Sequence, residues 1–143
     1  MNIKELLFGG SDIADGATNW GLTILRVFSG LALAFGHGIG KIPPSDGFIQ
    51  GVAKLGFPLP GFFAWAAGCS EFFGGILLAA GLVTRPAAFF ILCTMSTAGF
   101  IRHAQDPFTT KEKALLFAAI ALLFLLIGAG KYGVDVVIRR KVT

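Results

Sequence analysis

One glutamate stands in the middle of a long apolar run, and its type and position make it the first candidate for chemistry. The run from Gly61 to Thr84 reads GFFAWAAGCSEFFGGILLAAGLVT, and Glu71 is its only charged side chain. The run is long enough to cross a bilayer, where an unpaired carboxylate near the centre costs on the order of 3 kcal/mol. We therefore expect Glu71 to be protonated, paired, or directed into a polar cavity within the protein.

A second charge, Arg26, lies about two turns inside the apolar stretch from Trp20 to about Ile39, which we predict to be the first membrane helix. At about 1.5 Å of rise per residue, the axial gap between Arg26 and Glu71 is about 6 Å, within reach of an extended arginine. The leading expectation is therefore an Arg26–Glu71 ion pair between the first two helices. The alternative is that Arg26 reaches back to the lipid headgroups.

The first helix ends in FGHGIGK, which places a histidine and a lysine, His37 and Lys41, among glycines. Gly36 and Gly40 lie four residues apart, and Gly30, Ala34 and Gly38 form a neighbouring stripe of small residues. This spacing predicts close approach of another helix. A single histidine at a helix end is more often a hydrogen-bonded structural residue than a ligand. The flanking glycines nevertheless leave the His37 ring accessible, so a chemical role stays open.

A third polar group follows the third predicted helix, which runs from Pro86 to about Ile101. Because successive spans alternate in direction, Arg102 and His103 are expected at the same membrane face as the end of the first helix. Glu112 follows shortly after, at the start of a fourth helix predicted from near Lys111 to about Ala129. Thr109 or Thr110 is the expected cap of that helix, and the alternative reading of Glu112 is as its partner in a capping box.

The segment between the first two predicted spans is too proline-rich and too short to form another span. Residues 42–60 contain PPSDG and GFPLPG on either side of a stretch with an apolar face at helical spacing: Phe48, Ile49, Val52 and Leu55. This pattern predicts a short interfacial helix that covers a cavity below it. A surface loop anchored by aromatic residues is the alternative.

The composition is that of one integral membrane domain. The chain has 143 residues, of which 55% are apolar and 14% charged, and its mean hydropathy is +0.76; soluble domains carry about one quarter charged residues. The fold class we expect is all-α, a bundle of four transmembrane helices with a short interfacial helix between the first and second. We divide the chain into an N-terminal interfacial segment, residues 1–19, the membrane domain, residues 20–135, and a basic tail, residues 136–143.

The net charge of +4 does not indicate nucleic acid, because the basic residues lie at segment ends rather than on one patch. Lipid headgroups are their expected partners. Four spans place both ends of the membrane domain on one side. The slightly larger number of Lys and Arg residues there favours the cytoplasm.

Cofactor motifs are weak throughout the sequence. Cys69 and Cys93 show no CxxC or haem-attachment spacing and are interpreted as small buried hydrophobes. A haem between His37 and His103, or a metal held by these histidines with Asp106 or Glu112, has no diagnostic spacing. No flavin motif and no phosphate-binding glycine loop is present.

Aromatic walls and converging polar groups are what an amphipathic small molecule requires. Fifteen phenylalanines supply the walls, and a quinone or a similar lipophilic ligand would also need proton donors, for which Glu71 and His37 are the candidate catalytic residues. The candidate ligand-binding residues are Arg26, Lys41, Arg102, His103 and Glu112. The glycines would also permit a homo-oligomer.

Four separated motifs, FGHGIGK, GFPLP, EFFGGILLAAGLVTRPAA and EKALLFAAIALLFLLIGAGKYGVD, resemble the DoxX family of small bacterial membrane proteins over about residues 20–135. The resemblance implies a four-helix inner-membrane bundle and an oxidoreductase label inherited from a relative associated with thiosulfate:quinone oxidoreductase. It also implies that some members are membrane partners of soluble redox proteins. The motif residues of the family fall on His37, Lys41, Glu71, Gly75, Arg85, Glu112 and Asp135.

The sequence therefore supports two functions of different classes. The first is a membrane oxidoreductase, or a subunit of one, in a quinone-linked system that binds a quinone-like molecule or docks a soluble redox protein. The second is a non-catalytic scaffold or assembly factor in which the same polar groups only hold the helices together. A small transporter is less favoured, because one four-helix unit encloses little volume.

Overall fold

The computed structural model describes residues 7, 9–10 and 15–142, and no strand occurs among them. The predicted interfacial segment at residues 1–19 lies largely outside these residues. The elements in chain order are α2 (Gly16–Leu33), the π-helix η1 (Ala34–Gly38), the 3-10 helix η2 (Ile39–Lys41), α3 (Asp46–Lys54), α4 (Pro60–Ala80), α5 (Thr84–Thr97), the π-helix η3 (Ala98–Arg102), α6 (Phe108–Ile127) and α7 (Val134–Val142).

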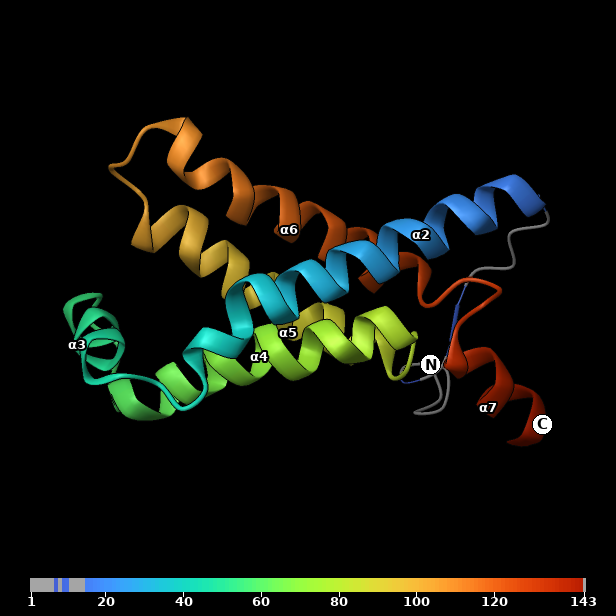
Figure 1. Cartoon of the computed structure of the whole chain (residues 1–143), viewed down its shortest axis with the longest axis horizontal. Helices are drawn as coiled ribbons and strands as arrows, with labels where there is room; N and C mark the ends of the chain where they lie inside the picture. Colours follow the sequence, from blue (N-terminus) through green and yellow to red (C-terminus); the bar gives the residue numbers. More distant parts are fainter. Residues whose placement is uncertain (1–6, 8, 11–14, 143) are drawn as a thin grey trace.

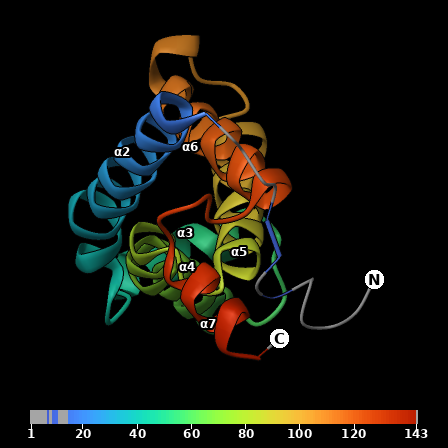
Figure 2. The ribbon, with the colours of Figure 1, turned by 90° about the vertical axis from the view of Figure 1, so that its right-hand side faces the viewer.

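The long helices pack side by side, with α4 between α2 and α5 and with α6 mainly against α5. Figure 2 shows the same arrangement from the end, with α2 over α4 and α6 over α5. In contrast, α2 and α6 share only a short contact and diverge toward the end that carries α3 (Figure 1). The core lies between these helices and consists of Leu33, Leu78, Ala88, Ile91, Met95, Ala118, Ala121 and Phe124.

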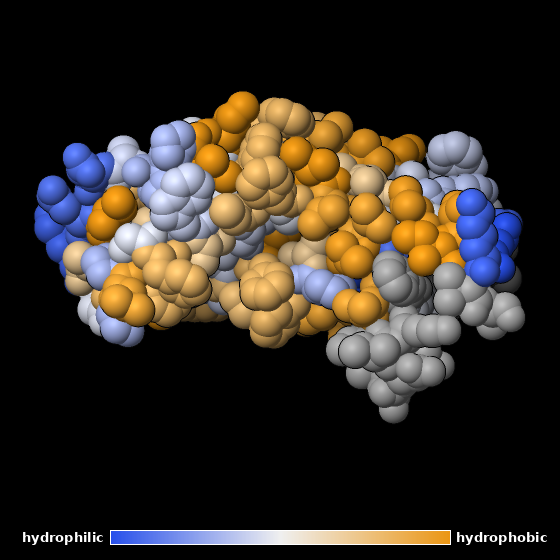
Figure 3. Space-filling model, turned by 90° about the horizontal axis from the view of Figure 1, so that it is seen from below, coloured by the Kyte–Doolittle hydropathy of each residue, from blue (hydrophilic) through white to orange (hydrophobic). Residues whose placement is uncertain are grey.

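Three helices within the described ranges are long and apolar enough to cross a membrane: Gly16–Lys41, Pro60–Ala80 and Thr84–Arg102. A fourth long helix, α6, has an apolar body but carries Lys111, Glu112 and Lys113 in its first turns. Figure 3 shows an apolar middle band with hydrophilic residues gathered toward the two ends of the molecule. The all-helical class is therefore confirmed together with three candidate spans, and the fourth span stays a prediction.

Glycine contacts determine how α2 lies on α4, as the stripe of small residues predicts. A Cβ on Gly75 would lie 2.6 Å from the Gly30 carbonyl oxygen, and one on Gly38 would lie 2.5 Å from the Phe72 amide nitrogen. In both cases the obstructing atom belongs to the backbone, which cannot move aside as a side chain can. By contrast, Gly36 and Gly40 have nothing within 4 Å of such a Cβ. The prediction of close approach along Gly30, Ala34 and Gly38 is confirmed.

The short helix between the first two spans is also confirmed, as α3, with Ser45 accepting a hydrogen bond from the Phe48 amide at its N-terminus. The prediction for the start of the fourth helix is wrong. Pro107 is the N-cap residue of α6, and no side chain caps that end. The fixed φ of proline allows a helix to begin directly after it. The two threonines, Thr109 and Thr110, therefore fall inside the first turn, and the capping box that would have included Glu112 does not form.

Candidate functional site

Glu71 forms an ion pair with Lys41, not with Arg26 as the sequence predicts. The Lys41 Nζ lies 2.5 Å from Oε1 and 2.6 Å from Oε2 of Glu71, so one ammonium binds both carboxylate oxygens. The Glu71 side chain is 2% exposed and the Lys41 side chain 32%. The carboxylate is thus buried and compensated, while its partner remains accessible from outside.

The position of Lys41 follows from where the first helix ends. Gly38 packs on the backbone of Glu71 and Phe72, and a Cβ on Gly68 would lie 2.8 Å from the Lys41 carbonyl oxygen. The first span therefore ends beside the middle of α4 and not beside its N-terminus. The N-terminal part of α4 instead packs against α3. The Phe48 ring of α3 lies 5.7 Å from the Lys41 Nζ and adds a cation–π contact.

This offset explains why the predicted partner of Glu71 is wrong. The predicted depths of Arg26 and Glu71 assumed that the first and second helices span the same layer from end to end. In the structure they are staggered, so Lys41 lies about one turn of α4 from Glu71, whereas Arg26 reaches the opposite, C-terminal end of α4.

His37 lies in the π-helix η1, and the residue is exposed. Its ring packs edge-on against Phe117 of α6, with the ring centroids 5.8 Å apart. A second π-helix, η3, comes directly before His103, so a π-helix accompanies each histidine. Single π-turns within α-helices are rare and are frequently found at functional sites. The chemical role of His37 stays a prediction.

The other predicted site residues gather at the turn between α5 and α6, at the same end as α3 (Figure 1). The His103 Nδ1 lies 2.6 Å from Asp106 Oδ2. Arg102 is exposed there, and Glu112 is half-buried in the first turns of α6. The His37 ring packs instead against Phe117, five residues beyond Glu112 on α6.

Among the described residues, no hydrogen bond, ion pair or ring contact joins His37 to His103. No group of three or more His, Cys, Asp or Glu side chains that could hold a metal ion occurs in the described part of the chain. The interpretation of both cysteines as buried is wrong, because Cys69 is only half-buried on α4 and Cys93 is exposed on α5; both are free thiols.

Arg26 lies at the C-terminal end of α4, where its side chain is almost completely buried. Its Nη1 donates to the carbonyl oxygens of Leu78 and Ala79, at 2.9 Å each. A cation is favourable there because the last carbonyls of a helix lack intrahelical partners. Gly81 follows with a φ of 68°, and a Cβ at that position would collide with the Arg26 guanidinium. The turn therefore requires glycine for two independent reasons.

Asp135, at the start of α7, holds the same turn from the other side. Its Oδ1 accepts from the Val83 amide at 2.7 Å and its Oδ2 from the Thr84 amide at 3.0 Å. Its own amide donates to the Gly81 carbonyl at 2.8 Å. The carboxylate also attracts the Arg26 guanidinium. We call Arg26, Gly81 and Asp135 the turn clamp.

Sequence reasoning placed Asp135 just past the membrane, but in the structure the residue is only 1% exposed. One signal pointed to it: a buried arginine needs a compensating carboxylate. Two other residues of the family motifs also make structural contacts. Gly75 packs on Gly30, and the Arg85 Nη2 donates to the Leu126 carbonyl at the end of α6.

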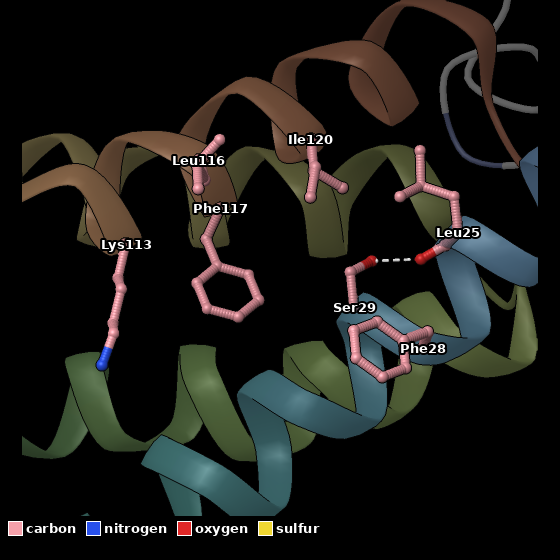
Figure 4. Close-up of a pocket in the computed structure, with 7 residues that line it drawn as sticks. All are labelled: Leu25, Phe28, Ser29, Lys113, Leu116, Phe117 and Ile120. Atoms are coloured by element: carbon pink, nitrogen blue, oxygen red, sulfur yellow. Dashed lines mark hydrogen bonds between the residues drawn. The ribbon is translucent and has the colours of Figure 1, made fainter.

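A groove of about 230 Å³ lies where α2 and α6 diverge. Figure 4 shows the Phe117 ring and the Lys113 chain extending from α6 toward α2, with Phe28 and Ser29 on the opposite wall. The lining residues are Leu25, Phe28, Ser29, Lys113, Leu116, Phe117 and Ile120. Sequence reasoning did not select Lys113, because a lysine at a helix start reads equally well as a contact to headgroups.

Comparison with known proteins identifies the family. The DoxX family model matches residues 21–104, which extend from within α2 to just past η3. The protein named "Putative oxidoreductase CatD" from Bacillus subtilis (strain 168) is 33% identical over 88 residues, which cover 62% of this chain and 63% of that protein. The chain thus spans less than two thirds of that relative's length. No solved structure matches. Because the family model covers more than half of the sequence, this chain belongs to the DoxX family.

Proposed function

We propose that this chain is a bacterial inner-membrane protein of a quinone-linked redox system, which binds a quinone-like molecule and docks a soluble redox protein. The observation that carries the proposal is the pair formed by Lys41 and Glu71. A charged pair on an apolar helix is costly to bury, yet its ammonium remains about one third exposed. A pair needed only for packing would have no reason to keep this opening.

The proposed membrane placement uses four spans, with α6 as the fourth. Residues 114–130 carry no charge, and α6 packs against α5, which itself meets the criteria for a span. The starts of α2 and α7 then lie on the cytoplasmic side, where Lys131, Arg140 and Lys141 would meet anionic headgroups. A reporter that is active only after export, fused behind α7, should be silent. Activity of that reporter would reverse the orientation.

The chemistry assigned to the site is proton supply. Reduction of a benzoquinone to its quinol adds two electrons and two protons to the ring oxygens. We assign these protons to the Lys41–Glu71 pair and to the exposed His37. The two electrons are assigned to a soluble redox protein that docks at the polar end around Arg102 and His103.

The first test is whether the purified protein carries a quinone. Protein in mild detergent is extracted with organic solvent, and the extract is quantified by mass spectrometry against protein concentration. We expect a quinone in near-stoichiometric amount in the wild type and in Lys131→Met, an exposed lysine at the other end. Glu71→Gln and His37→Ala should lose it while remaining folded by circular dichroism. A wild type without quinone, which also fails to bind an added short-chain benzoquinone, would refute the proposal.

A second candidate function is a membrane scaffold, and the turn clamp is the observation that favours it. Arg26 and Asp135 are both buried and both engaged in packing, so two of the most buried polar groups in the described structure hold helices together. The two functions differ in what His37→Ala does. In a redox protein the variant stays folded and loses reduction of added quinone, whereas in a scaffold it changes only stability or recovery of a partner.

A further inference from the structure

We propose that α7 binds anionic phospholipid at the surface of the bilayer, and that this contact stabilises the turn clamp through Asp135. The inference rests on the membrane placement given under the proposed function and uses none of its redox chemistry. It assigns a partner and a role to the last helix, Val134–Val142.

The last helix is attached to the rest of the described structure mainly through its first turn. Asp135 holds the α4–α5 turn, but no extended contact joins α7 to any other helix within the described ranges. Farther along, Arg139 donates to the Gly10 carbonyl oxygen at 3.4 Å. In Figure 1, α7 leaves the right-hand end of the bundle at an angle to the long helices. Most of α7 therefore lies on the outside, where a surface other than the protein can meet it.

The outward side of α7 combines exposed valines with exposed basic groups. Val134 is 41% exposed and Val137 55%. Arg140 and Lys141 are also exposed, and neither forms a hydrogen bond or ion pair within the described part of the chain. Arg140 and Lys141 follow Val137 by three and four residues, so the three side chains share one face of the helix. Helices that present apolar groups together with Lys and Arg lie in the interface of a bilayer, where the cations meet the headgroups.

The charge of this segment favours anionic over zwitterionic lipid. Asp135 is 1% exposed and engaged with the turn, so it offsets little of the positive charge at the surface. Each Lys or Arg close to an anionic bilayer surface strengthens binding by about fivefold. The basic residues among 131–142 are Lys131, Arg139, Arg140 and Lys141.

An aromatic pair places the start of α7 at the level of the headgroups. The rings of Trp20 and Tyr132 lie 4.9 Å apart, and both residues are exposed. Trp and Tyr gather at the two interfaces of a bilayer. Trp20 lies near the start of the first candidate span, and Tyr132 lies two residues before α7. The nearest anions to the basic groups of α7 are therefore phospholipid headgroups, which favours lipid over an acidic soluble protein as the partner.

The α4–α5 turn is the part of the fold that depends on the position of α7. Val83 has a φ of 42°, in the left-handed region that a β-branched residue rarely adopts. Such a conformation persists only where the surrounding structure imposes it. Asp135 supplies that constraint, because its two carboxylate oxygens accept from the Val83 and Thr84 amides. Lipid that holds α7 in place therefore also protects these two amides.

The test is hydrogen–deuterium exchange of the full-length protein in nanodiscs of phosphatidylcholine alone or mixed with phosphatidylglycerol. We expect phosphatidylglycerol to slow exchange in the peptides that cover α7 and residues 81–84 by at least about fivefold, because lipid bound to the closed state makes local opening rarer. Added salt should reduce the effect.

Charge-neutralising variants identify the residues responsible. The double variant Arg140→Gln, Lys141→Gln should lose the response to phosphatidylglycerol. The matched control, Lys54→Gln with Lys113→Gln, removes two exposed lysines at the opposite end and should keep the response. Unchanged exchange in α5 and α6 would show that both variants are folded.

Three outcomes would overturn the inference. Equal exchange of α7 in the two lipid compositions would refute recognition of anionic lipid. A response of α7 without any change in residues 81–84 would refute the coupling to the turn clamp. A response that Arg140→Gln, Lys141→Gln retains would exclude these residues as the lipid contact. Each result is independent of the quinone content of the protein, so a failure here is distinguishable from a failure of the proposed function.

Discussion

Removal of Lys41 provides the most direct test of the ion pair in the candidate site. Lys41→Met keeps the length and apolar stem of the side chain but leaves the Glu71 carboxylate, 2% exposed, without the only hydrogen-bond partner that the structure gives it. Breaking a buried pair in this way costs about 3–5 kcal/mol. Because the Lys41 side chain is 32% exposed and the pair is therefore open to screening, we take the lower end, about 3 kcal/mol.

Removal of the charge on Glu71 should cost less free energy of unfolding than removal of Lys41. Glu71→Gln leaves the ammonium of Lys41, which is 32% exposed and can turn to solvent or headgroups. We expect a loss of about 1 kcal/mol, mainly from the hydrogen bonds that the amide replaces imperfectly. In the double variant no buried charge remains without a partner. A double-mutant cycle should therefore return a coupling energy of about 2 kcal/mol.

The assay is reversible unfolding in mixed micelles with a rising fraction of sodium dodecyl sulfate, followed by far-ultraviolet circular dichroism. Lys131→Met serves as the control for removing an exposed lysine and should change the free energy of unfolding by less than about 0.5 kcal/mol. If the losses in the two single variants add to within about 0.5 kcal/mol, the residues are not coupled. The burial of Glu71 would then need another explanation.

Three further changes test other parts of the structure. Gly75→Ala should destabilise the protein by about 1–3 kcal/mol in the same assay, because the added Cβ would collide with the backbone of α2. Gly36→Ala should be neutral or stabilising, because its added Cβ has no atom within 4 Å. Equal losses of stability in the two variants would refute the packing of α2 on α4. Asp135→Ala should cost at least about 3 kcal/mol, because the amides of Val83 and Thr84 lose their acceptor and the buried Arg26 guanidinium loses a nearby negative charge; a loss below about 1 kcal/mol would contradict the turn clamp. Hydrogen bonds from Thr18 lower the pKa of Asp15 below its ordinary value of 3.8. The contribution of Asp15 to stability is therefore present above pH 3.8 and is lost as the pH falls through the lowered pKa. Asp15→Ala should remove this part of the acid dependence of stability, and an acid titration of stability that the substitution leaves unchanged would contradict the assignment.

Much of the fold can be predicted from the sequence because its signals are local. Helical runs, proline-rich turns and the spacing of Gly30, Ala34 and Gly38 predict the helices, the position of α3 and the face of α2 that meets α4. The partner of Glu71 could not be predicted in this way, because it depends on the stagger between two helices. That stagger is determined by the contact of Gly38 with Phe72, and rise per residue does not reveal it.

The groove and the turn clamp show the same limit. Nothing near Lys113 in the sequence indicates that α2 and α6 diverge, since this depends on how each packs against a third helix. Asp135 is more than fifty residues from the amides that it caps, and only the burial of Arg26 suggested that a carboxylate was needed. The local sequence pattern can identify a charged residue within an apolar segment, but its partner is determined by tertiary packing.

The turn clamp also has a consequence for biosynthesis. Arg26 and the α4–α5 turn leave the ribosome long before Asp135, which follows every long helix in the chain. During that interval the guanidinium can reach the carbonyls of α4, but the amides of Val83 and Thr84 have no acceptor and the positive charge has no counter-ion. The turn clamp can therefore be completed only after residue 135 has been made. That part lies beyond residues 21–104, the stretch by which the family is recognised.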